Sequence, residues 1–204
     1  MFAVLFEVEP QAERWDDYMR LAGMLRPELL RIEGFFDNRR FSSRRHPGRL
    51  LSLSLWRDEK ALVRWRAHAG HHAIQAVGRG EIFRDYHLRV GEVVRDGGNA
   101  LAQQRLDETA VGAARAVTIL DGPVGSEPPD APGLVDWDAF DGVTEPGTTL
   151  MLLSWRDAPA MAAWADDGAA RRLDVRIVRD YGMHARDEAP QYHRPVVRPE
   201  APGG

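Results

Sequence analysis

The chain has 204 residues, of which 44% are hydrophobic and 28% are charged, with no cysteine and a formal net charge of −4. The missing cysteines exclude disulfides, a cysteine nucleophile, thiolate-bound haem and cysteine-ligated zinc or iron–sulfur centres. Acidic residues outnumber basic ones, and no basic run is interleaved with aromatic residues, so we expect no nucleic-acid partner. Apolar runs fall short of the ~20 residues that span a bilayer, and the first residues, MFAVLFEVEP, resemble no cleavable leader. We therefore expect a cytoplasmic protein without membrane association.

The first 95 residues carry strand and helix patterns in the order β-α-β-β-α-β. Alternating and β-forming residues predict strands over 2–8, 35–41, 50–56 and 82–94. Apolar residues at helical spacing predict helices over 11–32, 58–69 and 71–77. Pro27 should kink the first helix, Asp58 should cap the second, and Gly34 and Gly78 should end the first and third. This order is that of the ferredoxin-like split unit, whose helix-free sheet face needs a cover.

The same pattern restarts after a polar linker over 96–112, with strands predicted over 114–120, 134–140, 148–155 and 173–183 and a short helix over 161–165. The motif WRDxxAxxxW begins at Trp56 and again at Trp155, and Arg-Asp-Tyr occurs at 84–86 and 179–181. These matches predict a tandem duplication: a unit over 1–95, a reduced unit over 113–186 and a Pro/Arg-rich tail over 187–204. We expect an α+β fold in which two ferredoxin-like units pack sheet to sheet as a pseudo-dimeric barrel. Whether whole chains also form a homodimer stays open.

Several residues of the first unit stand in a familiar arrangement: Glu33-Gly34-Phe35, Trp56, Trp65, His71-His72 and Tyr86. In these positions the unit resembles the antibiotic biosynthesis monooxygenase family of the dimeric α+β barrel superfamily, with 114–185 as a degenerate second copy. The resemblance implies a cofactor-free enzyme of secondary metabolism that oxidises an aromatic or polycyclic small molecule with dioxygen. Nucleotide-cofactor motifs such as GxGxxG are absent, which agrees with that chemistry. We expect the substrate in the barrel cavity, between sheet and helices.

The candidate catalytic residues are His72, Tyr86 and Trp65. Adjacent helical residues point about 100° apart, so only one of His71 and His72 can face a cavity. An imidazole titrates near neutral pH, and we prefer His72 as the base that exchanges protons with Tyr86. The candidate substrate-binding residues are His71, Trp56 and three residues that should share one face of a strand, namely Phe36, Asn38 and Arg40.

Haem binding is the first alternative, with His71 or His72, and less favourably His184, as axial ligand. For haem-degrading members, the resemblance implies an Asn, a Trp and a His. Trp65 matches the tryptophan, but Glu7 and Gln75 stand at the other two positions. Two further alternatives are a non-catalytic accessory protein and a cofactor-free cyclase or isomerase, because a fold alone does not define a reaction. We predict no metal site.

Overall fold

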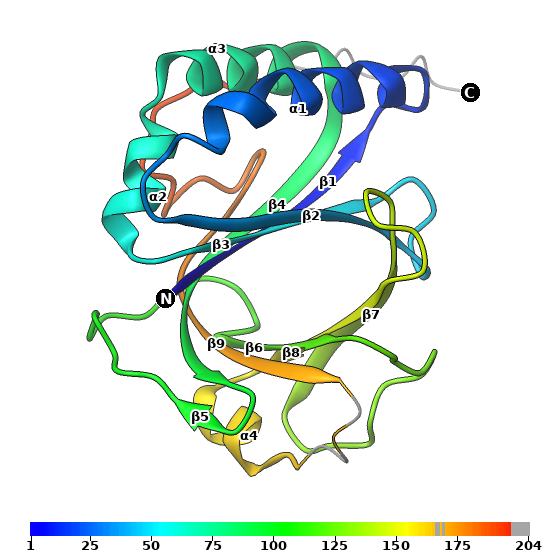
Figure 1. The fold of residues 1–204 in the computed structure, drawn as a ribbon, viewed down its shortest axis with the longest axis vertical. Coiled ribbons are helices and arrows are strands. Elements are labelled where there is room, and N and C mark those ends of the chain that lie inside the picture. Colours follow the sequence, from blue (N-terminus) through cyan, green and yellow to red (C-terminus); the bar gives the residue numbers. More distant parts are fainter. Residues whose placement is uncertain (166–167, 169, 197–204) are drawn as a thin grey trace.

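The computed structural model of the chain describes residues 1–165, 168 and 170–196, and its strands form one antiparallel sheet that closes into a barrel (Figure 1). The barrel closes because β1 pairs with both β3 and β4. The strands are β1 (Phe2–Pro10), β2 (Phe35–Ser43), β3 (Leu50–Trp56), β4 (Phe83–Asp96), β5 (Asn99–Ala100), β6 (Ala116–Asp121), β7 (Leu134–Gly142), β8 (Thr149–Trp155) and β9 (Arg171–Gly182). The helices are α1 (Trp15–Leu29), α2 (Glu59–Arg66), α3 (Ala69–Val77) and α4 (Ala158–Ala163).

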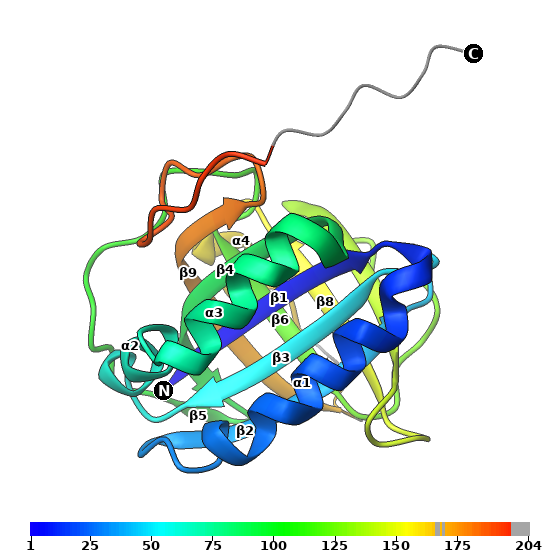
Figure 2. The ribbon, with the colours of Figure 1, turned by 90° about the horizontal axis from the view of Figure 1, so that it is seen from above.

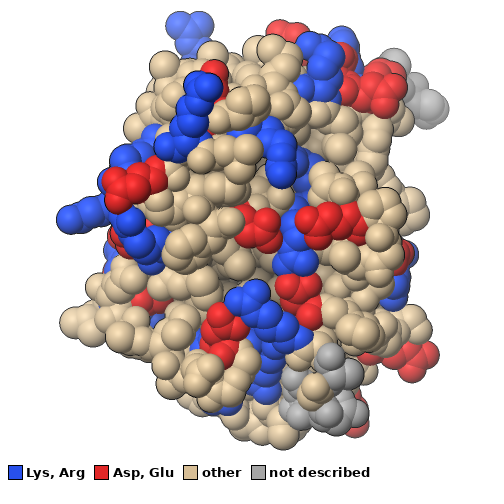
Figure 3. Space-filling model, in the orientation of Figure 1, with Lys and Arg blue, Asp and Glu red and all other residues tan. Residues whose placement is uncertain are grey.

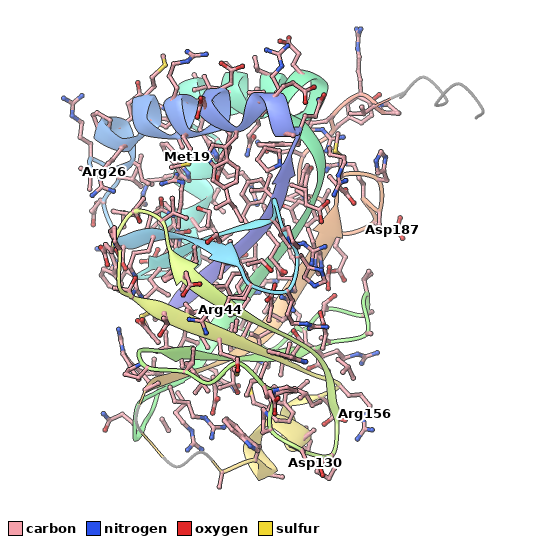
Figure 4. The ribbon with its side chains drawn as sticks, turned by 90° about the vertical axis from the view of Figure 1, so that its right-hand side faces the viewer. Met19, Arg26, Arg44, Asp130, Arg156 and Asp187 are labelled. Carbon is pink, nitrogen blue, oxygen red and sulfur yellow. The ribbon has the colours of Figure 1, made fainter. Side chains whose placement is uncertain are left out.

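The two halves of the chain contribute the same strand order, β2-β3-β1-β4 and β7-β8-β6-β9. The β4–β9 seam that joins them is long, whereas the β2–β7 seam begins at Phe41 and ends at Ser43. An ion pair of 2.6 Å between Arg44 and Asp141 adds to the short seam (Figure 4). The predicted α+β barrel of two ferredoxin-like units is confirmed. A homodimer of whole chains stays a prediction.

Apolar side chains from both halves fill the middle of the barrel. Strand alternation turns every second residue inward, and the buried set comprises Ala3, Leu5, Phe41, Leu51, Leu53, Leu55, Val93, Val117, Ile119, Phe140, Leu150, Leu152, Leu173, Val175 and Ile177. A substrate cavity in the middle of this barrel is therefore excluded by packing. α1 and α3 lie over the outer face of the first half of the sheet (Figure 2), and a cavity lies beneath them.

The repeated tryptophan motif has the same structural role in both halves. Asp58 accepts a hydrogen bond of 2.8 Å from the backbone N–H of Ala61, and Asp157 does the same for Ala160. Each carboxylate thus satisfies a free donor in the first turn of a helix. The preceding arginine in each copy donates its backbone N–H to a glycine carbonyl, that of Gly34 or Gly133. The repeat is explained by helix capping, with no need for a catalytic role.

Some expected helix boundaries differ in the structure. The first helix ends at Leu29, and Pro27 is accommodated in its last turn. α3 ends at Val77 with Gly78 as its cap, as expected, and the chain then continues through a wider turn over Gly78–Ile82. A Cβ at Gly78 would lie 2.5 Å from Cε2 of Phe83, so the missing side chain lets the phenylalanine ring pack against this turn. The turn brings Arg79 back over the sheet.

Two features of the structure concern possible membrane and charged partners: the length of the helices and the distribution of surface charges. No helix in the described part of the chain is long and apolar enough to cross a membrane. On the face shown in Figure 3, arginine and carboxylate side chains are interspersed over both halves of the barrel. Many of these charges form ion pairs, for example between Arg57 and Glu33 at 2.9 Å and between Arg171 and Asp96 at 2.7 Å.

The β4–β9 seam gives the first prediction. A Cβ at Gly91 would lie 2.3 Å from Cγ1 of Val175 and 2.8 Å from the carbonyl oxygen of Arg176. Because a backbone oxygen on the opposing strand cannot easily move away, Gly91→Ala should lower the free energy of unfolding by about 1–3 kcal/mol in urea titrations. The control is Gly23→Ala in α1, where no heavy atom lies within 4 Å. Equal stability of the two variants would contradict this description of the seam.

Candidate active site

A cavity of about 220 Å³ lies between the outer face of the β1–β4 sheet and the helices α1, α2 and α3. Its floor comes from neighbouring strands in register: Arg40 pairs with Ser52, which pairs with Phe6, which pairs with Leu88. The roof is apolar and includes Tyr18, Leu21, Ala22, Leu25 and Leu29 of α1 and Ile74 of α3. The cavity is therefore apolar in its middle and polar on both sides of β1.

Two polar groups of the cavity lining, one on β2 and one on α3, lack a protein partner among the described residues. Asn38 Nδ2 donates to Ser52 Oγ at 3.0 Å and to the carbonyl oxygen of Leu53 at 3.2 Å. The Nε of Arg40 and the Oε1 of Gln75 are buried and have no hydrogen-bond partner among the described residues. Buried polar atoms are nearly always paired, so one free donor and one free acceptor facing a cavity indicate a place for a polar ligand.

His71 lies against the cavity wall as a neutral imidazole. Its ring stacks on the indole of Trp65, with centroids 4.3 Å apart and planes inclined by 14°. Its Nδ1 lies 3.1 Å from the carbonyl oxygen of Trp65, which can only accept, so Nδ1 carries the proton and Nε2 the lone pair. Burial lowers the pKa of His71 from its ordinary value of 6.5 to about 4. At neutral pH this residue can accept a hydrogen bond but is a weak base.

On the other side of β1, two arginines converge on the hydroxyl of Tyr86. Arg79, from the turn after α3, donates to the Tyr86 oxygen and, at 3.2 Å, to the carbonyl oxygen of Met183. Arg186, from the segment after β9, donates to the same Tyr86 oxygen at 2.8 Å. Burial and the neighbouring Tyr86 raise the pKa of Tyr181 to about 12, so Tyr181 keeps its proton at neutral pH.

The structure brings most of the predicted site residues together. Six of them line this one cavity: Asn38, Arg40, Trp56, Trp65, His71 and Tyr86. Tyr86 faces the helices, whereas the next residue, His87, points toward the end of the barrel and lies 2.6 Å from Asp180. Strand alternation thus separates the two residues as expected. The function of the six residues stays a prediction.

Three predicted residues lie elsewhere. His72 is exposed and stacks on His193 at 5.4 Å, so the helix turns His71 rather than His72 toward the cavity. Phe36 is 56% exposed, because a β-bulge between Phe35 and Asp37 shifts the alternation of β2. His184 is exposed beside a second, polar hollow at the end of the barrel.

The sequence analysis missed many residues of the cavity, among them Arg79, Arg186 and His193. Arg79 stands in a Gly-Arg-Gly sequence that gave no recognisable pattern, and the other two belong to the segment after β9. The richness of that segment in arginine is the one feature of the sequence that could have marked it as a candidate part of the site. Among the described residues, no three histidine or carboxylate side chains are grouped as metal ligands.

The strands define a closed α+β barrel with a cavity beneath the helices of its first half, and comparisons with known proteins show the family to which this fold belongs. The model of the antibiotic biosynthesis monooxygenase family matches residues 1–77. The chain is 40% identical over 217 aligned positions to the jasmonate monooxygenase ABM of Pyricularia oryzae, with 96% of this chain and 100% of that protein covered. The chain belongs to the antibiotic biosynthesis monooxygenase family and is a monooxygenase-type enzyme.

Solved structures also resemble the chain. A conserved protein from Methanosarcina mazei is 21% identical, with 44% of this chain and 88% of that chain covered and a TM-score of 0.41. An anthrone oxidase-like protein is 15% identical, with 93% of this chain and 96% of that chain covered and a TM-score of 0.38.

The buried imidazole makes stability depend on pH. Because the pKa of His71 is lower in the folded state, the unfolded chain binds more protons below pH 6.5, and stability falls as the pH drops from 6.5 to about 4. His71→Gln should remove up to about 3 kcal/mol of this loss, measured by urea unfolding across that range. In the control His72→Gln, the exposed neighbour is replaced, and the loss should persist. An unchanged pH profile in His71→Gln would contradict the buried neutral state.

Proposed function

We propose that this chain transfers oxygen from O2 to a small, mainly apolar molecule in the cavity beneath α1 and α3, with electrons supplied by the substrate itself. The volume of the cavity carries this proposal. At about 220 Å³ it falls below the ~300–1,000 Å³ of sites for drug-sized ligands, so it suits a small substrate without a bound redox cofactor. A balanced reaction is the conversion of a CH2 group and O2 into a C=O group and water.

The unpaired polar atoms suggest how the substrate is activated. Arg40 and Asn38 lie on one strand face and can hold a carbonyl or phenol oxygen of the substrate. When a neighbouring carbon or the phenol loses its proton, the resulting enolate or phenolate is stabilised by the guanidinium in a site with little water. This electron-rich anion is the species that reduces O2. His71 Nε2 and Gln75 Oε1 are available as hydrogen-bond acceptors on the helix side.

Two features of the cavity support a reaction without haem. A haem is larger than the ligands for which cavities of this volume are suited. The ring of His71 is stacked on Trp65, and the two other candidate ligands, His72 and His184, do not line the cavity. We therefore assign no step to haem. Membership of a monooxygenase family also favours an enzyme over an accessory protein or an isomerase.

The name of the Pyricularia oryzae relative indicates that it acts on jasmonate, and we propose jasmonate as the first substrate to test. The aromatic or polycyclic substrate and the role in secondary metabolism stay predictions. Among aromatic and polycyclic substrates, the cavity volume favours a compact molecule over a polycycle.

The test is oxygen uptake with jasmonate under ¹⁸O2, followed by mass spectrometry of the product. The wild type should consume O2 without added haem or reductant and incorporate one ¹⁸O atom. Asn38→Ala and Arg40→Gln should lower kcat/KM about 10–100-fold, because each removes a group that holds the substrate oxygen.

Matched exposed residues provide the controls: Asn99→Ala and Arg31→Gln should keep wild-type rates. Turnover that requires added haem or a nicotinamide would overturn the proposal. Equal losses in the control variants would show that the effects are not specific to the cavity.

A further inference from the structure

The charge of the cavity is unbalanced. Five arginines line it, and among the described residues none of the five forms an ion pair; they are Arg40, Arg66, Arg79, Arg179 and Arg186. The one carboxylate in the lining, Glu59, is paired with Arg105. Elsewhere, arginines of this chain are commonly paired, for example Arg39 with Asp121 at 2.5 Å. The cavity thus holds positive charge without a protein counterion.

This charge is most buried where Arg79 and Arg186 meet, and we call these two residues the arginine pair. Arg79 is buried, with only 5% of its surface exposed. Besides Tyr86, the acceptors of the pair are backbone carbonyls: Met183 for Arg79, and Gly182 at 3.3 Å and Gln191 at 2.9 Å for Arg186. These acceptors are neutral. A buried charge is costly when only neutral groups surround it, so the arginine pair favours the arrival of an anion.

The pair still has hydrogen atoms to donate. A guanidinium has five N–H donors, and the bonds above use only some of them on each arginine. The positive charge is also felt by His193, whose pKa is lowered by burial and by the charges of Arg79 and Arg186. Planar guanidinium groups match the two oxygens of a carboxylate better than any other anion-binding side chain.

We propose that the arginine pair, together with the Tyr86 hydroxyl, is a binding subsite for the carboxylate of an amphiphilic organic acid. The proposal rests on the proposed function in taking the same cavity as the substrate site. The apolar body of the acid lies over Phe6 and Leu88 and beneath α1. β1 and β3 separate β4, which carries Tyr86, from β2, which carries Arg40, so the carboxylate is held on the side of the cavity away from Arg40.

The second half of the chain completes this subsite. Arg186, Gln191 and His193 follow β9 and lie against the first half (Figure 2). Gln191 Nε2 donates to the carbonyl oxygen of Arg66 at 3.3 Å, and His193 stacks on His72 of α3. Asp187, in the same segment, is directed toward the outside of the molecule (Figure 4). The other carboxylate of the segment, Glu188, accepts hydrogen bonds from Thr109 Oγ1 at 2.7 Å and from the backbone N–H of Asp180 at 2.7 Å. The segment therefore brings a cation to the cavity, whereas neither of its carboxylates lines the cavity.

The test compares octanoate and octanol, two probes with the same number of carbon atoms, by isothermal titration calorimetry of the full-length protein. Wild type should bind octanoate at least tenfold more tightly than octanol, and added salt should weaken only octanoate. Arg186→Gln should remove most of this preference without changing the affinity for octanol, whereas Arg186→Lys should keep part of it. The control Arg31→Gln replaces an exposed arginine and should behave as wild type. Arg186 carries the test because replacement of the more buried Arg79 can prevent folding.

Three results would overturn the subsite. The first is equal affinity for octanoate and octanol in the wild type, and the second is an unchanged preference in Arg186→Gln. The third is a preference for octanoate that is absent in the wild type and appears only in Tyr86→Phe, because the phenol oxygen would then itself be the counterion of the arginine pair. We expect Tyr86→Phe to keep the wild-type preference, since this variant keeps both guanidinium groups.

Binding and turnover separate this proposal from the proposed function. If octanoate binds with the expected preference but jasmonate is not oxygenated, the subsite stands and the proposed function fails. If jasmonate and its methyl ester are oxygenated equally well and Arg186→Gln changes neither rate, the proposed function stands and the subsite fails.

Discussion

The antiparallel ladder between β4 and β9 is the interaction on which the rest of the structure depends. It pairs His87 with Gly182 at one end and Asp96 with Leu173 at the other, whereas the opposite seam of the barrel is far shorter. The ladder joins the two halves of the barrel and thereby helps to bury the helix-free faces of both sheets. It also fixes where β9 ends, which is beside Tyr86. The chain after β9 can therefore reach the cavity of the first half, although it is distant in sequence.

Closure also explains why the two halves differ. In the first half, α1 and α3 stand above the sheet and leave a cavity in which Trp56 and Trp65 are wall residues. In the second half, the loop between β6 and β7 replaces the long helix, and Trp155 packs directly on Trp164 at 5.6 Å. Arg172 covers the Trp164 ring at 4.9 Å. In the described part of the second half, these side chains pack on one another, whereas the corresponding tryptophans of the first half line a cavity.

The sequence was sufficient to predict the barrel and several cavity residues, because both depend on periodicity. Alternation along β2 predicts that Asn38 and Arg40 share one face, and alternation along β4 separates Tyr86 from His87. Only the structure shows that the helices cover the face with Asn38, Arg40 and Tyr86. The choice between His71 and His72 depends on the rotation of α3 about its axis, which tertiary packing sets. Phe36 leaves the expected face because one extra residue in a bulge reverses the alternation, and local sequence does not reveal it.

Arg186 could not be predicted for a different reason: its contact with Tyr86 spans 100 positions of the chain and depends on the closed ladder. The contact between Arg186 and Tyr86 also departs from the pairing of arginines with carboxylates that is common elsewhere in this chain. On the surface and along the seams, arginines commonly meet carboxylates, as Arg171 meets Asp96. In the cavity they meet carbonyls and a phenol. A folded protein tolerates such local departures mainly at functional sites, where a ligand supplies the missing partner. An anion that binds only the folded state stabilises it, so the carboxylate subsite that we propose would supply the counterion that the described part of the chain does not provide for the arginine pair.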